Sequence, residues 1–174
     1  MTGLDIRLDE YLRTHKKDAA PSMDVVALSG DASTRRYFRL TPKEGSSSIV
    51  ALYPDPFDAQ ATPFYTVGQA LIQMGLPVPK LLDHDGPLGV YEQEDLGDLT
   101  LQHVLAEASV EQKVDLYREA IDEIVQAQRE APKVPQRAVC FHTAFDIEKL
   151  SWELHYFEKH FLELHRRVDL SVED

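Results

Sequence analysis

The spacing of hydrophobic residues changes twice in the first half of the chain. In residues 4–15, apolar side chains recur every three or four positions between charged ones, which predicts a short amphipathic helix that ends before Pro21. From residue 25 onward, the runs VVALSGD, YFRL, SSIVALY and LGVYEQ are rich in β-branched and aromatic residues and are separated by Gly, Ser and Pro. These runs predict the strands of a small antiparallel sheet.

One helix interrupts the predicted strands. Residues 63–74 again carry apolar side chains three or four positions apart, and Gly75 follows as a helix stop. The Asp-Gly pair at 85–86 is a hairpin signal. We therefore expect residues 83–85 to form a turn between two strands.

After Gly97 the strand pattern disappears. Helices are expected in its place over residues 100–106, 110–129 and 146–164. Residues 131–142 contain two prolines and are expected to form a loop. Strands followed by helices predict an α+β protein, with one domain over residues 1–96 and another over residues 97–174.

Composition and charge exclude several classes of protein. The 174 residues are 43% apolar and carry a formal net charge of -12, so the chain can form a core and repels the phosphate backbone of nucleic acids. Its one cysteine, Cys140, is expected to be a buried small residue in a reducing compartment. No apolar run approaches the roughly 20 residues of a membrane span or resembles a signal-peptide core. The sequence therefore predicts a cytoplasmic protein with neither a membrane nor nucleic acid among its partners.

The segment 28–40, LSGDASTRRYFRL, combines small residues with basic ones. A turn of small residues lets backbone N–H groups approach a phosphate, because no bulky side chain intervenes. Between Asp31 and Glu44 there is no acid, and the basic residues are Arg35, Arg36, Arg39 and Lys43. Either this turn holds a phosphate, or it is a solvated edge strand with alternating arginines. It is neither a dinucleotide-binding fingerprint nor a Walker loop, since Gly30 stands alone and no Gly-Lys-Ser or Gly-Lys-Thr follows.

Four strings are informative together: GDASTRRYFRL, IVALYPDP, GLPVPKLLDHD and YEQEDLGDLTL. They resemble the N-terminal lobe of the aminoglycoside phosphotransferase family, whose fold is like that of a protein kinase. Within this family, the DASTRRYFR part of the first string is most similar to the anomeric sugar kinases that phosphorylate N-acetylmuramate and N-acetylglucosamine at the C1 hydroxyl. The later string FDIEKLSWELHYFEKHFLE resembles those kinases where their second lobe begins.

The resemblance implies a protein-kinase-like N-lobe, a small antiparallel sheet with one packed helix, followed by the first helices of a mainly helical C-lobe. It implies ATP and Mg²⁺ as cofactors and a small sugar or amino sugar as substrate. The residues implied to bind the nucleotide form a loop over the phosphates, two arginines beside it and the adenine-binding hinge: Ser29, Gly30, Asp31, Ala32, Ser33, Arg35, Arg36, Glu94, Asp95 and Leu96. In the last helix, Trp152 and Glu153 are implied to face the sugar, although residues at such spacing also pack in cores.

Two departures from the family's pattern change what we expect of this chain. The strand IVALYPDP has no lysine and the helix PFYTVGQALIQM has no glutamate, so both partners of the ion pair that holds the α- and β-phosphates in kinases are missing. We hypothesise that Arg35 or Arg36 supplies this charge instead. The chain also contains no asparagine and no H-x-D-x-x-x-x-N string, so the catalytic loop is absent. It resembles the first half of a kinase.

Two hypotheses of function follow. In the first, the chain is the nucleotide-binding lobe of an ATP-dependent phosphotransferase that phosphorylates a sugar hydroxyl, specifically the anomeric hydroxyl of an amino sugar, and it is inactive by itself. In the second, it is a truncated, non-catalytic pseudokinase that binds a nucleotide or a protein partner. No catalytic or metal-binding residue is assigned in either case.

The last predicted helix carries histidines as well as apolar residues. His155, His160 and His165 are five positions apart, and five residues of an α-helix turn by about 140°, so these side chains cannot converge on a metal ion. Apolar side chains near the end of this helix are expected to lie uncovered. A homodimer is therefore expected through a face that includes Phe157, Phe161 and Leu164.

Overall fold

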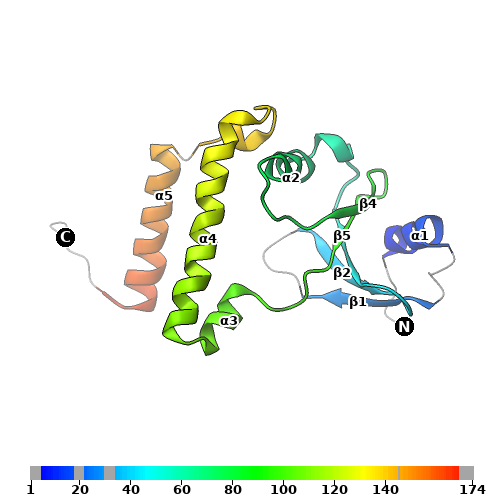
Figure 1. Ribbon diagram of the computed structural model, residues 1–174, viewed down its shortest axis with the longest axis horizontal. Helices are drawn as coiled ribbons and strands as arrows, with labels where there is room; N and C mark the ends of the chain where they lie inside the picture. Colours follow the sequence, from blue (N-terminus) through cyan, green and yellow to red (C-terminus); the bar gives the residue numbers. More distant parts are fainter. Residues whose placement is uncertain (1–4, 18–21, 30–33, 145, 169–174) are drawn as a thin grey trace. The chain divides into compact units, whose positions relative to one another are not determined.

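The computed structural model describes residues 5–17, 22–29, 34–144 and 146–168. The chain forms two compact units, Met1–Arg137 and Ala138–Asp174. The first unit holds a β-sheet and the helices around it, and the second holds one long helix (Figure 1). The boundary expected between residues 96 and 97 falls inside the first unit.

Five strands of the described residues form one antiparallel sheet in the order β1-β2-β3-β5-β4 (Figure 1). They are β1 (Asp24–Leu28), β2 (Arg36–Thr41), β3 (Ser48–Leu52), β4 (Leu81–Asp85) and β5 (Val90–Glu94). The central strand β3 is buried along its whole length, which explains its nearly continuous apolar sequence. The predicted α+β class, with a small antiparallel sheet followed by helices, is confirmed.

The two faces of the sheet have different partners. Phe38 of β2 and Val50 of β3 are paired and point to what we call the outer face. There, helix α1 (Ile6–His15) packs Leu8 and Leu12 into the core cluster that these two side chains form with their neighbours. Successive strand residues point to opposite sides, so the residues between them face the other side, the inner face.

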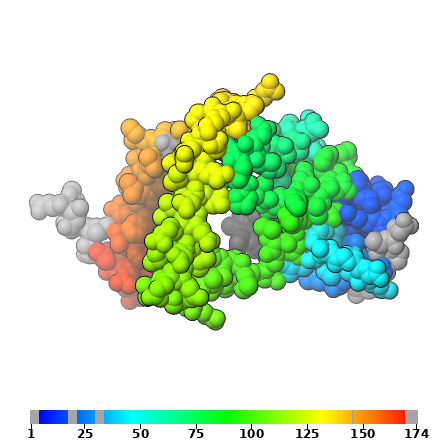
Figure 2. Space-filling view, viewed as in Figure 1, coloured from blue at the N-terminus to red at the C-terminus, as the bar shows by residue number. Residues whose placement is uncertain are grey.

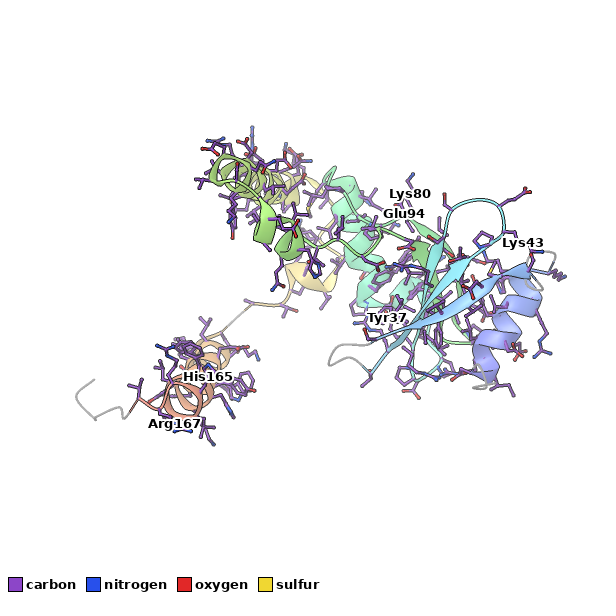
Figure 3. The ribbon with its side chains drawn as sticks, turned by 90° about the horizontal axis from the view of Figure 1, so that it is seen from below. Tyr37, Lys43, Lys80, Glu94, His165 and Arg167 are labelled. Atoms are coloured by element: carbon purple, nitrogen blue, oxygen red, sulfur yellow. The ribbon has the colours of Figure 1, made fainter. Side chains whose placement is uncertain are left out.

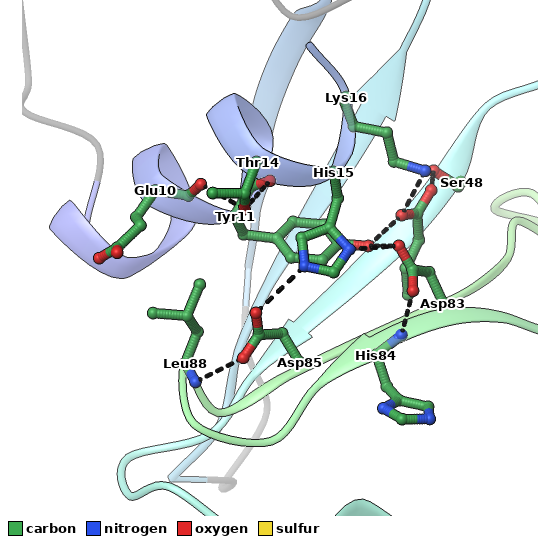
Figure 4. A network of polar contacts seen from close by, with 11 residues as sticks. Glu10, Tyr11, Thr14, His15, Lys16, Ser48, Asp83, His84, Asp85 and Leu88 are labelled. Carbon is green, nitrogen blue, oxygen red and sulfur yellow. Dashed lines mark hydrogen bonds and ion pairs between the residues drawn. The ribbon is translucent and has the colours of Figure 1, made fainter.

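The outer face also carries a buried polar network beneath α1 (Figure 4). The hydroxyl oxygen of Tyr11 lies 2.6 Å from Glu92 Oε2 and 3.0 Å from Asp83 Oδ2. Glu92 also accepts a hydrogen bond from Ser48 Oγ at 2.7 Å and pairs with Lys16 Nζ at 2.8 Å. Burial, and then the hydrogen bond to Glu92, raise the pKa of Tyr11, so its hydroxyl keeps the proton that it donates. The network fastens the end of α1 to β3, β4 and β5.

His15 makes a second link from α1 to the sheet (Figure 4). Its Nδ1 lies 2.9 Å from Asp83 Oδ2, and its Nε2 lies 3.1 Å from Asp85 Oδ2. Burial raises the pKa of Asp83, but hydrogen bonds from the backbone of His84, from Tyr11 and from His15 outweigh it and hold that pKa below its usual value. The Asp83 carboxylate therefore stays charged under α1.

The prediction of a turn at residues 83–85 is wrong. These residues lie in β4, where Asp83 is paired with Glu92 and His84 with Tyr91, and the turn follows at residues 86–89. The Asp-Gly pair located the reversal of the chain. Asp83 and Asp85 hid the usual strand pattern of alternating apolar residues, because their carboxylates face the outer-face polar network and not an apolar core.

Helix α2 (Pro63–Gln73) agrees with the prediction from the sequence. The Thr62 side chain caps its first turn, and proline occupies the first helical position. The chain leaves the helix through Gly75 at a φ of +75°, a conformation that favours glycine. Phe64 packs against the inner-face residue Tyr91, with 5.0 Å between ring centroids, so α2 lies on the inner face. The resemblance implied one helix packed on the sheet; α2 occupies that place, and α1 covers the opposite face.

Two helices follow the sheet in the first unit, α3 (Leu101–Glu107) and α4 (Val110–Glu130), and both begin with a capping box. Gln126 of α4 donates hydrogen bonds to the carbonyl oxygens of Met74 and Gly75 at 3.0 and 2.9 Å. In Figure 2 this end of α4 touches the end of α2. One stripe of α4 exposes apolar side chains: Val114, Tyr117, Ile121, Ile124 and Val125.

In the second unit, α5 (Ile147–Phe157) continues into a π-helix at Glu158–His165. Residues five apart lie nearly above one another in a π-helix, so the spacing argument from an α-helix does not hold for His160 and His165. Each of these two rings instead packs on an aromatic ring four residues before it.

The segment between α4 and α5 contains 3₁₀ turns at Ala131–Lys133 and Val139–Phe141. Cys140 lies in the second turn and is exposed, so the expectation that it is buried is wrong. A three-residue turn at the surface offers its side chains few packing partners.

Candidate functional site

The inner face of the sheet carries the residues from which a site can be built. Directly paired residues of antiparallel strands share a face. On the inner face, paired residues form rows that cross the sheet from β1 to β5. The row next to the C-terminal end of β5 consists of Val26, Arg39, Ile49 and Gln93, and the next row consists of Leu28, Tyr37, Ala51 and Tyr91. Arg35 directly precedes β2, four positions before Arg39, and lies at the opposite end of that strand from Thr41. We call residues 94–98, which follow the first row, the hinge segment.

The hinge end of the inner face combines the apolar Val26 and Ile49 with the polar Arg39 and Gln93, and it is partly open. Val26 of β1 is an exposed hydrophobic residue, while Ile49 and Ala51 are buried. Leu96, two residues beyond β5, is 69% exposed. Apolar side chains beside available backbone groups suit a flat heteroaromatic ring, which needs both packing and a few oriented hydrogen bonds.

The backbone groups of the hinge segment differ in availability. The N–H of Glu94 donates to the carbonyl oxygen of Lys80 at 2.8 Å, and the N–H of Lys80 donates to Glu94 Oε2 at 3.2 Å. The labels of Lys80 and Glu94 stand next to each other in Figure 3. The backbone of Leu96 makes no hydrogen bond with any residue that the structure describes. Of these predicted hinge residues, Leu96 can therefore offer its backbone to a ligand, whereas the N–H of Glu94 is already engaged.

The two predicted phosphate-binding arginines lie on opposite sides of the sheet. Arg35 Nη1 donates to Tyr53 Oη at 3.1 Å, and its guanidinium carbon lies 5.2 Å from the centre of that ring. Arg36 forms an ion pair with Asp5, the cap of α1, on the outer face. Successive strand residues alternate between faces, which explains the separation. Arg35 is thus on the inner face, at the end opposite the hinge segment.

A cavity of about 740 Å³ opens beside Arg35. Its walls are Tyr53 and Pro54, the segment before β4, and the side of α2 that carries Val67 and Leu71. Most of this lining is apolar, and Arg35 supplies a cationic group at its edge. The cavity runs from Arg35 to Leu81, which is paired with Gln93 beside the hinge segment. An anionic group inside it could meet the guanidinium of Arg35.

Arg39, in the row beside the hinge segment, is held by two carboxylates. Its Nε and Nη2 donate to Asp95 at 2.7 and 3.2 Å, and its Nη1 and Nη2 donate to Asp98 at 3.0 and 2.8 Å. Hydrogen bonds to Asp98 and Asp95 raise the pKa of Arg39, and the hydrogen bond from Arg39 lowers the pKa of Asp95 to about 2. Two carboxylates neutralise this guanidinium, so it is unsuited to hold a phosphate.

Substituting Asp95 with asparagine is expected to lower the free energy of unfolding by about 1 kcal/mol at pH 7, after allowance for solvent screening. The folded-state pKa of Asp95 is about 2, below the usual 3.8. Its contribution is therefore complete above about pH 4 and is lost as the pH falls toward 2. Urea unfolding at pH 7, 4 and 3 should show the difference between the two proteins shrinking at low pH. A difference that grows as the pH falls would contradict this account.

The predicted phosphate loop is partly described. Ser29 directly follows β1, while Gly30, Asp31, Ala32 and Ser33 lie outside the described residues. Sequence reasoning missed Tyr53, which holds the guanidinium of Arg35. The signal was available, since Tyr53 is two positions beyond Ala51 and alternation places both on one face.

The predicted sugar-binding residues lie in the second unit. Lys149 Nζ lies 4.0 Å from the centre of the Trp152 ring and 3.0 Å from Glu153 Oε1. The Trp152 and Tyr156 rings follow one another along the helix, with 5.3 Å between centroids. An exposed aromatic face flanked by a paired carboxylate can stack on a sugar and accept its hydroxyl hydrogen bonds.

The described residues bring together no group of three or more histidine, cysteine, aspartate or glutamate side chains that could hold a metal ion. Among the same residues, no helix has the length and apolar character needed to cross a membrane.

Comparisons with known proteins identify the family of this chain. A model of the phosphotransferase enzyme family matches residues 24–170. The chain is 31% identical over 170 residues to the N-acetylmuramate/N-acetylglucosamine kinase of Pseudomonas aeruginosa, a match that covers 98% of this chain and 47% of the relative.

Two further relatives carry the same name. The Neisseria meningitidis serogroup B protein is 34% identical over 125 residues, which cover 71% of this chain and 36% of the relative. The Pseudomonas putida protein is 29% identical over 126 residues, which cover 72% and 36%. The chain thus spans about half the length of the first of these relatives. No solved structure gives a significant match.

Proposed function

Because the chain belongs to the phosphotransferase enzyme family, we propose that its first unit binds ATP on the inner face of the sheet. The observation that carries this proposal is the arrangement of the inner face. The available backbone of Leu96 stands at its hinge end, and the guanidinium of Arg35 stands at its far end. Apolar side chains of β1 and β3 lie between them. This order matches the parts of an extended nucleotide, from base to phosphates.

Each part of ATP is assigned its own contacts on the inner face. The adenine ring packs against Val26 and Ile49 and forms hydrogen bonds with the backbone of Leu96. The phosphates reach Arg35, whose guanidinium can bind phosphate oxygens in a bidentate manner. The resemblance implies a loop over the phosphates at residues 29–33, of which the structure describes Ser29. Mg²⁺, when bound with the nucleotide, neutralises phosphate charge.

For the whole protein, we propose transfer of the γ-phosphoryl group of ATP to a hydroxyl of an amino sugar, specifically the anomeric hydroxyl. The curated relatives are named as kinases of N-acetylmuramate and N-acetylglucosamine, which supports this acceptor class. Trp152 and Glu153 are the residues proposed to contact the sugar. A cytoplasmic location belongs to the same proposal, because ATP is held in that compartment.

The second candidate, a module that binds nucleotide without transferring phosphate, is favoured for this chain by one feature. The sequence holds no asparagine and no H-x-D-x-x-x-x-N string. Those residues orient the acceptor hydroxyl and hold Mg²⁺ during phosphoryl transfer. We therefore propose that the chain by itself binds ATP without turnover, and that the exposed apolar stripe of α4 and the end of the last helix favour self-association.

Alanine at Arg35 is expected to weaken ATP binding by at least about tenfold, because a charged hydrogen bond to phosphate is worth about 1.5–3 kcal/mol. Alanine at Arg36 is the matched control. It removes the adjacent arginine on the outer face, and its effect should stay within about twofold. Isothermal titration of the full chain with ATP measures both. Equal losses for the two variants would contradict the assignment of faces, and a wild-type chain that binds no ATP would overturn the proposed function.

A further inference from the structure

We propose that Arg39, Asp95 and Asp98 form a hinge clamp that fixes the hinge segment on strand β2 and so positions the backbone of Leu96 for adenine. This inference rests on the proposed ATP site for its ligand. It assigns to these three residues a positioning role. Contact with the phosphates is not part of that role.

Asp95 is the fixed half of the clamp. Its side chain is 6% exposed and is surrounded by donors on three sides. Besides Arg39, Ser47 Oγ donates to Asp95 Oδ2 at 2.7 Å, and the N–H of Gly97 donates to Asp95 Oδ1 at 2.9 Å. A buried carboxylate with this many donors is held in one position. It ties the hinge segment to β2 and to the residue before β3.

Asp98 is the open half of the clamp. Its side chain is 79% exposed, yet both of its oxygens accept hydrogen bonds from Arg39. The chain reverses between the two aspartates at Gly97, whose φ is +80°. The turn brings Asp98 back to the guanidinium that Asp95 already occupies. Leu96 lies inside this loop, between the two carboxylates.

The anchor of the clamp is rigid. Arg39 lies on β2 between Phe38 and Leu40, which are both buried in the core under α1. The planar guanidinium offers a fork of donors that can pair with two carboxylates in a bidentate manner, whereas the donors of a lysine ammonium share one nitrogen. Without Arg39, the two aspartates would repel each other across the turn. The position of Leu96 relative to the inner face therefore depends on this arginine.

If the clamp positions Leu96, loss of Arg39 should weaken the binding of adenine and leave the binding of the phosphates nearly unchanged. Arg39→Met should accelerate hydrogen exchange of the Leu96 and Gly97 amides in the ligand-free chain by about tenfold. Without Arg39, the turn can open locally without breaking the hydrogen bonds of the clamp. The substitution should weaken ATP binding by about tenfold, since a shift of about 1 Å in a positioning group has effects of this order or larger. Binding of inorganic triphosphate, which has no base, should change by less than about twofold.

The experiment compares five forms of the full chain by amide exchange in nuclear magnetic resonance and by titration with ATP and with triphosphate. Asp95→Asn removes the fixed half while leaving Arg39, and should reproduce most of the effect. Arg39→Lys should restore part of it. Arg118→Met removes an arginine from an exposed ion pair on α4 and should change neither readout. Circular dichroism verifies that each variant is folded, and Asp95→Asn serves if Arg39→Met does not fold.

The outcomes separate the clamp from the ATP proposal. Faster exchange with a selective loss of ATP affinity supports the inference. Unchanged exchange overturns it, as does faster exchange with ATP affinity unchanged or with equal losses for ATP and triphosphate. If the wild-type chain binds neither ligand, the proposed function fails and the positioning role fails with it. The exchange data then decide whether the three residues fix the hinge segment at all.

Discussion

Replacing Gly86 with alanine is expected to lower the free energy of unfolding by about 3 kcal/mol. Gly86 is buried in the turn between β4 and β5, and a Cβ there would overlap the carbonyl oxygen of Phe57. Neither backbone segment can yield easily. The carbonyl oxygen of Gly86 accepts hydrogen bonds from the N–H groups of Phe57 and Gly89, both at 3.0 Å. Relieving the clash would stretch or break these buried bonds.

The matched control for this variant is Gly68→Ala. Gly68 lies within α2, and a Cβ at this position meets no atom within 4 Å. Alanine is favoured over glycine in a helix interior by about 1 kcal/mol, so this variant should be at least as stable as the wild type. Urea unfolding followed by circular dichroism compares the three proteins. A loss below about 1 kcal/mol for Gly86→Ala would contradict the prediction, since overpacking that rigid surroundings cannot relieve costs more.

Alanine at Glu92 is the second variant with a large expected effect, a loss of about 3 kcal/mol or more in the free energy of unfolding. Glu92 is 3% exposed and joins the hydroxyls of Tyr11 and Ser48 to the ammonium of Lys16. Its removal leaves a cavity, takes the acceptor from the buried Ser48 hydroxyl and leaves the Tyr11 hydroxyl with Asp83 alone. Buried donors without partners cost free energy in addition to the packing that is lost.

Two further variants make the test of Glu92 specific. Glu92→Gln keeps the shape and one acceptor oxygen, so it should lose less stability than Glu92→Ala. Glu123→Ala removes an exposed carboxylate from α4 and should change stability by less than about 0.5 kcal/mol. The same urea titration measures all three. If Glu92→Gln is as stable as the wild type, the charge pairing with Lys16 contributes nothing and hydrogen bonding alone carries the network.

Local patterns in the sequence were sufficient for most elements. The alternation in β2 and β3 and the helical spacing of α2 and α4 reflect interactions between residues a few positions apart. Thr62 and Gly75 mark the two ends of α2 for the same reason. These signals depend on backbone geometry and on the nearest neighbours in the chain, which any reader of the sequence can inspect.

Part of the candidate site was also within reach of the sequence. Alternation along β2 separates Arg35 from Arg36, although it does not tell which face binds a nucleotide. That choice needs the positions of α1 and α2, which cover opposite faces of the sheet. The structure therefore selects Arg35 between the two arginines that the sequence proposed.

Contacts between residues far apart in the chain could not be predicted from the sequence. Arg39 stands 56 and 59 positions before Asp95 and Asp98, and Tyr11 stands 81 positions before Glu92. Such pairs exist because the strand order places β2 beside β3 and β5 between β3 and β4. Arg39 was counted as a phosphate-binding charge for lack of this information.

The sequence by itself determined the α+β class, the positions of most helices and strands, and the resemblance to a phosphotransferase lobe, because these depend on local spacing and on short motifs. The tertiary structure decided that β4 is a strand and that Arg39 is neutralised. It also decided that the backbone of Leu96 is open while the N–H of Glu94 is engaged. These features depend on which strands become neighbours, and that arrangement brings together residues far apart in the sequence.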